Sequence, residues 1–321
     1  MHAIRIQRHG GPEVLESAEV PVPEPGPGRI RVRLQAIGVN FIDVYQRTGL
    51  YPQSLPFVPG VEGAGVVDAV GPQVAGVRVG DRVAFAQQPG SYAAQAVIEA
   101  TRAVHVPVGI GMDTAAALLL QGMTAHYLAC DTFPLRQGHM ALVHAGAGGV
   151  GLLLTQIAVR RGARVLATVS SEAKAELARG AGAERVVRYD REDFAAAARA
   201  WSGGRGVDVV YDSVAATTFA GSLASLRPRG MLVLYGQSSG PVPPFDLREL
   251  SKGAWFVTRP TLHHYVHLPE ELQARSRDLF AWLAEGWLRV RIGQRWPLGE
   301  AAAAHRALEG RATTGKVLLM P

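Results

Sequence analysis

Five predicted strands alternate with four predicted helices between residues 140 and 236, and no other feature of the chain constrains its fold as strongly. The first strand, "MALVHA", is a short apolar run, and a helix follows it after a glycine-rich turn. Strands and helices that alternate at this length build βαβ units, so we predict an α/β fold with a doubly wound parallel sheet. The strands are expected at 140–145, 164–169, 185–189, 207–213 and 231–236, with a sixth at 254–260, and the helices at 149–161, 172–179, 192–200 and 216–226.

The first part of the chain has a different pattern, in which Gly and Pro separate short β-rich pieces. The segment 30–39, "IRVRLQAIGV", alternates apolar and polar residues as a half-buried strand does. Several short strands at such spacing predict a compact, mostly antiparallel barrel. The tail has two amphipathic helices and a last strand, "KVLLM", which is too little for a separate domain. We therefore expect one domain from residues 1–123 with 263–321, and a second from residues 124–262.

The turn after the first predicted strand reads "AGAGGVG", with Gly146, Gly148 and Gly151 in G-x-G-x-x-G spacing. Glycine is required where the backbone turns tightly, approaches a pyrophosphate and packs a helix against a strand, and the helix N-terminus then offers N–H donors. Because the motif stands between a strand and a helix, we favour a dinucleotide site over a turn that serves packing alone. Gly148, Gly149 and Val150 are the expected contacts to the cofactor.

The end of the second predicted strand bears on the choice between NAD and NADP. A fold that prefers NAD places Asp or Glu there to hold the ribose 2′-OH, but this chain has Ser170 and Ser171, followed by Lys174. Small hydroxyls and a cation suit a 2′-phosphate, so NADPH is favoured. Glu172 lies past the strand end, where an acid favours the first turn of a helix. In the alternative interpretation the serines cap that helix and Lys174 is solvated, and both interpretations can hold together.

The composition excludes several other classes of protein. With a single cysteine, Cys130, the chain has no internal disulfide and no cysteine-based zinc site. The first residues lack an apolar signal core and no run of 18 apolar residues is present, so we expect a cytoplasmic protein. The net charge of +6 permits nucleic-acid binding, but the basic residues are scattered, which is typical of a solvated Arg-rich surface.

Motifs along nearly the whole chain resemble the medium-chain dehydrogenase/reductase superfamily, and within it the quinone oxidoreductase (ζ-crystallin-like) branch. They are "HGGPEVLE", "IGVNFIDVYQRTGLYP", "PGVEGAGVV", "GDRVAF", "AGAGGVG", "VVYDSV", "YGQSSG", "VTRP" and "RATTGKVLL", in this order. The resemblance implies a GroES-like catalytic domain, a Rossmann domain, an active site in the cleft between them, and NADPH as the reductant. It also implies a homodimer.

The zinc alcohol dehydrogenases of the same superfamily differ from this chain at the positions of their metal ligands. Asn40, the only asparagine, stands where a Cys is expected, and Val61 stands where a His is expected before Glu62. Another Cys or acid is expected near Gln121. Asn, Val and Gln supply neither thiolate nor imidazole, so we predict that no catalytic zinc is bound.

Hydride transfer without a metal suits an easily reduced acceptor, such as a quinone or a carbonyl conjugated to C=C, and relies on positioning and on hydrogen bonds to the developing oxyanion. The catalytic candidates are Asn40, Tyr45 and Tyr51. Asn40 could orient the nicotinamide ribose or carboxamide, or donate to the acceptor oxygen, and the two tyrosines offer phenolic donors and flat faces for a quinone. Asp43 could position either partner or be an exposed helix residue. For each tyrosine, core packing is the alternative.

Further contacts to NADPH follow from the resemblance. Tyr127 is expected to contact the cofactor or to pack at the domain junction, and Arg311 to reach the 2′-phosphate or to lie at a helix C-terminus as a charge that suits the dipole. The complete set of cofactor contacts predicted outside the glycine loop is Asn40, Tyr45, Tyr127, Ser170, Ser171, Lys174, Tyr189, Ser213, Tyr235, Gly236, Gln237, Val257, Thr258 and Arg311.

Three functions remain open at this point. The first is an NADPH:quinone oxidoreductase, and the second is an NADPH-dependent alkenal or enone reductase with the same scaffold and hydride step. The third is an NADPH-gated RNA-binding or structural protein, against which the lack of a basic stripe with interleaved aromatic residues argues. The apolar strand 254–260 would pair two sheets in the expected homodimer.

Overall fold

The computed structural model describes residues 1–321, which divide into two compact units. Unit 1 consists of Met1–Leu120, Val266–Ala284 and Val290–Pro321, and unit 2 of Gln121–Tyr265 and Glu285–Arg289. The expected domains broke the chain after residues 123 and 262 and had no counterpart to the return of Glu285–Arg289 to unit 2.

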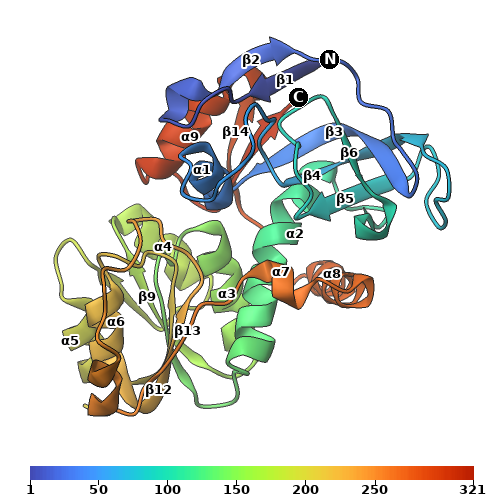
Figure 1. The fold of residues 1–321 in the computed structure, drawn as a ribbon. Coiled ribbons are helices and arrows are strands. Elements are labelled where there is room, and N and C mark those ends of the chain that lie inside the picture. The colour runs from blue at the N-terminus through green and yellow to red at the C-terminus, as the bar shows by residue number, and fades with distance from the viewer. The chain divides into compact units, whose positions relative to one another are not determined.

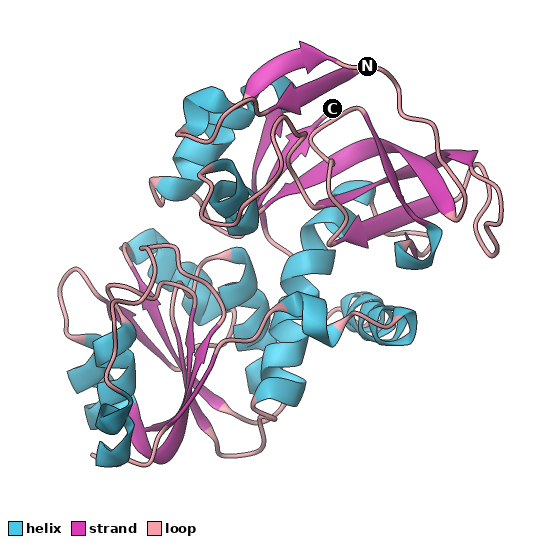
Figure 2. Cartoon of the chain, in the orientation of Figure 1, coloured by secondary structure: helices cyan, strands magenta, loops and turns pink.

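Unit 2 is built on a six-stranded parallel sheet with helices on both faces (Figures 1 and 2). The strand order is β10-β9-β8-β11-β12-β13, the order of a doubly wound dinucleotide-binding sheet. The strands are β8 (Met140–Val143), β9 (Arg164–Val169), β10 (Arg185–Arg188), β11 (Val207–Asp212), β12 (Leu226–Leu234) and β13 (Phe256–Thr258), and the helices are α3 (Gly149–Arg160), α4 (Glu172–Gly180), α5 (Phe194–Trp201), α6 (Phe219–Ser225) and α7 (Leu262–Tyr265).

The predicted alternation is confirmed, and its ends shift for local reasons. β8 ends at Val143, two residues early, because Ala145 takes a positive φ of 51° to begin the glycine turn. β12 begins at Leu226, before the expected start at 231, because Leu226 already pairs with Val207, and it ends at Leu234, before the expected end at 236. β8 and β11 are buried along their whole length, as strands covered by helices on both faces must be.

Unit 1 is a mostly antiparallel sheet of order β14-β15-β3-β4-β5-β7, with β6 also pairing with β3. The strand β15 lies against β3, so the end of the chain joins the sheet of the first residues (Figure 1). The core lies between these strands and α9. The strands are β3 (Arg29–Val39), β4 (Glu62–Val70), β5 (Arg82–Ala86), β6 (Gln95–Glu99), β7 (Val104–His105), β14 (Ile292–Pro297) and β15 (Lys316–Met320), with a separate hairpin of β1 (His2–Arg5) and β2 (Glu16–Glu19).

Few helices accompany this sheet. They are α1 (Phe41–Arg47), α8 (Pro269–Ala284) and α9 (Ala301–Glu309), while α2 (Met112–Tyr127) begins in unit 1 and ends in unit 2. The chain thus has the predicted α/β class, a parallel Rossmann-like sheet and a second, mostly antiparallel unit. Short 3-10 turns occur at Pro12–Val14, Ala100–Arg102, Leu247–Lys252 and Leu298–Glu300, and a π-helical turn at Leu128–Thr132.

Candidate functional site

The glycine turn of unit 2 has the geometry that a pyrophosphate needs. A Cβ on Gly146 would lie 2.7 Å from the Cβ of Ala167, and one on Gly151 would collide with the carbonyl of Ala145, so both glycines are required for packing. A Cβ on Gly148 would meet only that carbonyl oxygen, at 3.2 Å. Of these three glycines, Gly148 is therefore the one least restricted by its neighbours, and the lack of a side chain there allows close approach of a phosphate.

The same turn opens α3. Its N-cap is Gly148, and no side chain accepts a hydrogen bond from the first N–H groups of the helix. Twelve residues of helix thus end in uncapped donors with the positive end of the dipole, an arrangement suited to an anion. The residues present fit a dinucleotide.

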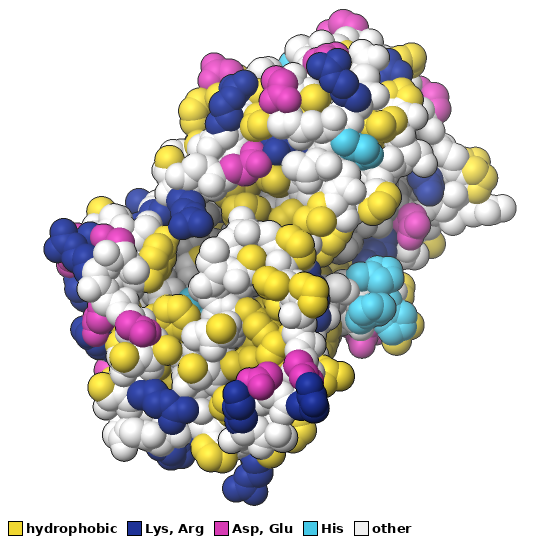
Figure 3. All heavy atoms as spheres, turned by 60° about the vertical axis from the view of Figure 1, so that its left-hand side comes forward, with side chains coloured by type: hydrophobic (Ala, Val, Ile, Leu, Met, Phe, Trp, Pro, Cys, Tyr) yellow, Lys and Arg dark blue, Asp and Glu magenta, His cyan; other side chains and the backbone are white.

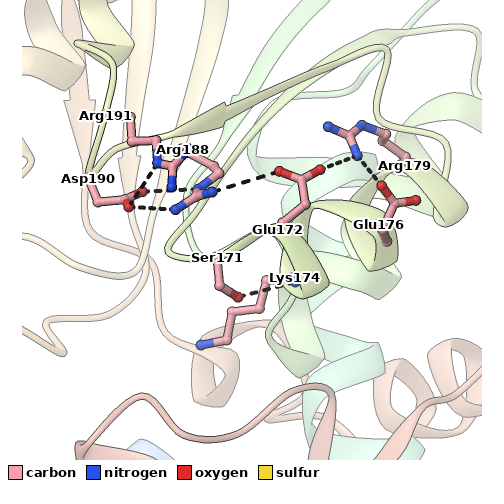
Figure 4. A network of polar contacts seen from close by, with 8 residues as sticks. All are labelled: Ser171, Glu172, Lys174, Glu176, Arg179, Arg188, Asp190 and Arg191. Carbon is pink, nitrogen blue, oxygen red and sulfur yellow. Dashed lines mark hydrogen bonds and ion pairs between the residues drawn. The ribbon is translucent and has the colours of Figure 1, made fainter.

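Beyond β9, the predicted 2′-phosphate residues Ser170, Ser171 and Lys174 lie together, and Figure 4 shows the last two. Ser171 caps α4 by accepting the N–H of Lys174 at 3.3 Å, so the capping alternative for this serine is confirmed. The Lys174 Nζ donates to Ser170 Oγ at 3.3 Å. This places the ammonium beside the small hydroxyl at the strand end, in the position where an NAD-specific fold has its acid.

Glu172, the one acid close to this position, is engaged elsewhere. Its carboxylate accepts from Arg179 at 2.8 Å and lies 3.9 Å from Arg188 (Figure 4). The hydrogen bond from Arg179, and then the positive charges of Arg179, Arg188 and Arg191, lower the pKa of Glu172, so it stays ionised and paired. An acid held in this way is a poor partner for a ribose 2′-OH.

The end of β10 adds more charge to this corner. Arg188 donates to Asp190 at 2.7 Å, and Arg191 lies 3.8 Å from the same carboxylate (Figure 4). Between them, Tyr189 is 40% exposed, and its N–H donates to the carbonyl of Val169 at the end of β9. Tyr189 therefore stands next to the strand end that carries the two serines.

The other predicted contacts in unit 2 follow the carboxyl ends of β11 and β12 or lie in β13. The Ser213 carbonyl accepts the N–H of Ser238 at 3.0 Å, which joins the two loops. A Cβ on Gly236 would lie 2.8 Å from that carbonyl, so the loops can approach only because this residue is glycine. These residues share the edge of the sheet with the glycine turn, where Rossmann ligands bind. They are Ser213, Tyr235, Gly236, Gln237, Val257 and Thr258.

Tyr127 lies at the end of α2 and is buried, 1% exposed. Its ring stacks on that of Tyr265, with centroids 4.1 Å apart and an interplanar angle of 9°. The structure therefore gives Tyr127 a packing partner within unit 2, which is the alternative offered for it.

In unit 1, Asn40 occupies the N-cap position of α1 and is 5% exposed. Its Nδ2 donates to Glu62 Oε2 at 2.9 Å and to the carbonyl of Gly38 at 3.2 Å, while its Oδ1 accepts from Lys316 Nζ at 2.7 Å. Both N–H groups of the carboxamide are used by the protein. As placed here, Asn40 has no donor left for an acceptor oxygen, and only Oδ1 has an unused lone pair.

Glu62 and Lys316 form a buried ion pair that sequence reasoning missed. The Nζ–Oε2 distance is 2.5 Å, and the side chains are 0% and 1% exposed. The other oxygen of Glu62 accepts the N–H of Leu120 at 2.6 Å. The signal that could have found the pair is compositional, since Lys316 is one of only three lysines in an Arg-rich chain.

The two candidate tyrosines of unit 1 lie against each other. The rings of Tyr45 and Tyr51 are 5.2 Å apart and meet edge to face, and Phe41 lies 6.1 Å from Tyr45. Tyr45 is 8% exposed, whereas Tyr51 is only partly buried. The cluster joins two rings of α1 to Tyr51 just beyond the helix, and Tyr51 is more accessible than Tyr45.

Asp43 is 0% exposed, so the alternative of an exposed helix residue is wrong. Its Oδ2 accepts from the Asn40 N–H at 2.8 Å and from the Tyr92 hydroxyl at 3.0 Å, and its Oδ1 has no hydrogen-bond partner. Burial raises the pKa of Asp43 from 3.8 to about 7, against the lowering effects of those two hydrogen bonds and of Lys316.

Behind Tyr92 lies a histidine that is held neutral. The hydroxyl of Tyr92 is 2.9 Å from His305 Nε2, and the Nδ1 of His305 is 3.2 Å from Arg47. Arg47 also forms a two-pronged pair with Glu309, at 2.8 and 2.9 Å. Burial, and then the charge of Arg47, lower the pKa of His305 to about 3.

Arg311 belongs to unit 1 and is exposed just beyond α9, with a positive φ of 57°. Its N–H donates to the carbonyl of Leu308 at 3.2 Å. It therefore stands at a helix C-terminus, as its alternative interpretation expects, and it shares no unit with Lys174.

No group of three or more His, Cys, Asp or Glu side chains lies close enough to hold a metal ion. No helix is both long and apolar enough to span a bilayer. Much of the positive charge is paired at the surface, and on the face in Figure 3 the Lys and Arg side chains are interspersed with acidic ones. Examples are Arg164 with Glu184, Arg185 with Glu192 and Arg248 with Asp246.

Comparisons with known proteins agree with this geometry. Residues 26–134 match the model of the alcohol dehydrogenase GroES-like domain, and residues 181–319 match that of the zinc-binding dehydrogenases. A quinone oxidoreductase from Pseudomonas aeruginosa is 47% identical over 99% of both chains, and a 2-haloacrylate reductase from Burkholderia sp. is 42% identical over 98% of both. The structure of Escherichia coli quinone oxidoreductase complexed with NADPH superposes with a TM-score of 0.98, at 42% identity and full coverage of both chains. The chain therefore belongs to the medium-chain dehydrogenase/reductase superfamily, in its quinone oxidoreductase branch.

Proposed function

We propose that this protein is an NADPH:quinone oxidoreductase that works without zinc. The observation that carries the proposal is the uncapped glycine turn of unit 2, which fits a dinucleotide, in a chain 47% identical to a quinone oxidoreductase over nearly its whole length. Unit 2 is the NADPH-binding domain, and unit 1 is the catalytic, GroES-like domain.

NADPH, when bound, supplies the hydride, and a quinone that takes it up together with a proton becomes a hydroquinone. Gly149 and Val150 present backbone N–H groups to the pyrophosphate. Gly148, whose own N–H donates to the Ala145 carbonyl at 2.8 Å, contacts the pyrophosphate as the residue that has no side chain in its way. Ser170 and Lys174 bind the 2′-phosphate. The ammonium group of Lys174 offsets its negative charge, and the neighbouring hydroxyl of Ser170 can donate a hydrogen bond to it. The other cofactor contacts proposed are those that lie along the same edge of the sheet, together with Arg311 of unit 1.

Tyr51, the more accessible of the two rings, provides a flat face for the quinone, and Tyr45 packs edge to face with it. The Oδ1 atom of Asn40 accepts a hydrogen bond from a hydroxyl of the nicotinamide ribose. Its N–H groups cannot take part, because they donate to Glu62 and Gly38. Zinc takes no part in this scheme because Asn40, Val61 and Gln121 offer no thiolate or imidazole.

A second function is favoured by one comparison. One relative, 42% identical over 98% of both chains, is a 2-haloacrylate reductase, and a haloacrylate has a C=C bond conjugated to a carboxylate. Reduction of an alkenal or enone by NADPH is therefore the alternative for this protein, with an unchanged cofactor site.

The test is NADPH oxidation after exhaustive chelation, with a naphthoquinone, an α,β-unsaturated ketone and 2-chloroacrylate compared side by side. We expect the quinone to have the highest kcat/KM. A higher kcat/KM for either conjugated C=C substrate would establish the alternative. NADPH binding without turnover of any of the three would overturn both.

We also propose a homodimer paired through β13. This strand lies at the edge of the sheet, and Phe256 and Val257 are 56% and 38% exposed on it. An apolar edge strand that is not covered pairs readily with a second copy. Sedimentation at micromolar concentration should give the dimer mass, and an F256E variant should give the monomer mass.

A further inference from the structure

The orientation of one chain of buried hydrogen bonds in unit 1 follows from Arg47. The chain runs from Arg47 to His305, Tyr92 and Asp43, with heavy-atom distances of 3.2, 2.9 and 3.0 Å. Arg47 can only donate, so Nδ1 of His305 must be the acceptor and Nε2 must carry the proton. Nε2–H then donates to the Tyr92 oxygen, and the single hydroxyl proton of Tyr92 points to Asp43.

This direction decides where Asp43 can hold a proton. Its Oδ2 already accepts two hydrogen bonds, from Tyr92 and from the N–H of Asn40, so a proton on the carboxyl belongs on Oδ1. That oxygen is buried and has no partner. The reverse direction, in which Oδ2 of Asp43 carries the proton and Tyr92 donates to Nε2 of His305, is excluded. It would put the His305 proton on Nδ1, where it would face the N–H of Arg47.

The charges around Asp43 leave it without a cation of its own. Lys316, from β15, pairs with Glu62 from β4, and Arg47 pairs with Glu309. Tyr92, from the segment before β6, faces Asp43, and His305, from α9, lies on the other side of the Tyr92 hydroxyl. Both are neutral, since burial raises the pKa of Tyr92 and lowers that of His305. When Asp43 is neutral, the charges of the two ion pairs cancel. When it is ionised, the buried side of α1 carries one additional negative charge.

We propose that Asp43 is a positioning residue whose proton on Oδ1 keeps the interior next to Asn40 uncharged. Loss of this proton then slows reduction of the acceptor. The inference rests on the proposed function. The direction follows from electrostatics, because a hydride added to a quinone creates an oxyanion, and a negative charge on Asp43, which accepts the N–H of Asn40, opposes it. The raised pKa of Asp43, about 7, places the change in the neutral range.

The state of Asp43 can be measured without turnover. Infrared difference spectra between about pH 5 and about pH 9 should show the C=O stretch of a buried protonated carboxyl that disappears in one step on the alkaline side. Asp43→Asn should lack the band. Asp81→Asn is the matched control, since Asp81 lies in a turn with Arg78 and its pKa is lowered, and it should keep the band. If the wild-type protein shows no such band at acid pH, the proposal is overturned.

Turnover supplies the second measurement. In the wild-type protein and in Asp81→Asn, kcat/KM for a naphthoquinone should fall about tenfold between about pH 6 and about pH 8, as the protonated fraction of one group falls. In Asp43→Asn the profile should be flat. A wild-type profile that is flat, while the infrared band titrates, would refute the link to catalysis. Absence of quinone turnover at every pH would instead count against the proposed function and leave the infrared result standing.

Tyr92→Phe keeps the proposal testable if Asp43→Asn does not fold. Removing the hydroxyl takes away a hydrogen bond that favours the ionised carboxylate, so both the infrared step and the kinetic step should move to higher pH. A purely structural role for Tyr92 would lower the activity at all pH values and leave the step in place, which would overturn the proposal.

Discussion

One ion pair from each unit shows how strongly burial changes the role of a charge. In unit 2 the ion pair of Glu172 with Arg179 is 2.8 Å long, and its side chains are 58% and 48% exposed. In unit 1 the pair of Glu62 with Lys316 is 2.5 Å long and almost fully buried. The first pair can be broken while water solvates both partners, whereas the second leaves a charge in the interior. The backbone donors at the start of α3 are likewise left open, while the polar groups around Asn40 are bonded to one another.

The largest effect is expected on the free energy of unfolding, when one partner of each ion pair is substituted in turn. Lys316→Met leaves Glu62 buried without its cation and should lower the free energy of unfolding by about 3–5 kcal/mol. Arg179→Met, the matched change in the exposed pair, should change the free energy of unfolding far less, because water solvates the carboxylate that is left. Urea unfolding of the two variants measures both. An equal loss of unfolding free energy in both variants would show that burial does not make the two ion pairs differ.

The next effect concerns pH and stability. Asp43 has its pKa raised from 3.8 to about 7, so its contribution to stability is present below about 4 and is lost as the pH rises toward 7. His305 has its pKa lowered from 6.5 to about 3, so its contribution is present above 6.5 and is lost as the pH falls. Between about pH 4 and about pH 6.5 the two slopes oppose each other, because unfolding moves one proton from the aspartate to the histidine.

Single variants should uncover each slope. In Asp43→Asn the stability should rise with pH in this window by up to about 1.4 kcal/mol per unit, and in His305→Gln it should fall by a similar amount. Chemical unfolding at four or five pH values is sufficient. A variant pair with the same slope as the wild-type protein would mean that the two groups do not compensate each other.

Two glycines of the same turn sharpen the comparison within unit 2. Gly148→Ala should leave stability nearly unchanged, since its Cβ meets only one carbonyl at 3.2 Å, but should weaken NADPH binding about tenfold, or about 1.4 kcal/mol. Gly151→Ala should destabilise the unit, because its Cβ collides with the carbonyl of Ala145. Fluorescence titration and thermal unfolding separate the two roles. Equal loss of stability in both variants would contradict them.

The smallest effect is on cofactor preference. Lys174→Ala should raise KM for NADPH several-fold, by about 1 kcal/mol, and leave KM for NADH unchanged, because only the 2′-phosphate is lost as a partner. Arg179→Ala serves as the control, since that cation is occupied by Glu172 and Glu176. The ratio of the two KM values is the readout, and a change of the same size for NADH would remove Lys174 from the phosphate site.

How far the sequence predicts the structure differs between the units for a physical reason. The parallel sheet and its glycine turn are written in local patterns, so the order of strands and helices and the place of Gly148 could be predicted. The burial of Asp43 could not, because it depends on Tyr92 and His305, which lie 49 and 262 positions away. A short helix such as α1 gives no sign of which face will be covered.

The same reasoning applies to the hydrogen-bond partners of Asn40. Its rarity and its family resemblance directed attention to it, but the partners that occupy its carboxamide come from β4 and β15. Only the folded sheet shows that its N–H groups are already used. The roles of the site residues in binding and turnover stay predictions until the variants are measured.

The pairing of β15 with β3 has a consequence for the order in which the protein is made. Asn40 and Glu62 leave the ribosome long before Lys316, and Tyr92 long before His305. The main segment of unit 2, Gln121–Tyr265, is synthesised without interruption and can fold while the tail is still being translated. Nascent unit 1 must therefore carry an uncompensated glutamate and an open sheet edge until the tail arrives, and this half of the molecule is the one on which we expect chaperones to act during synthesis.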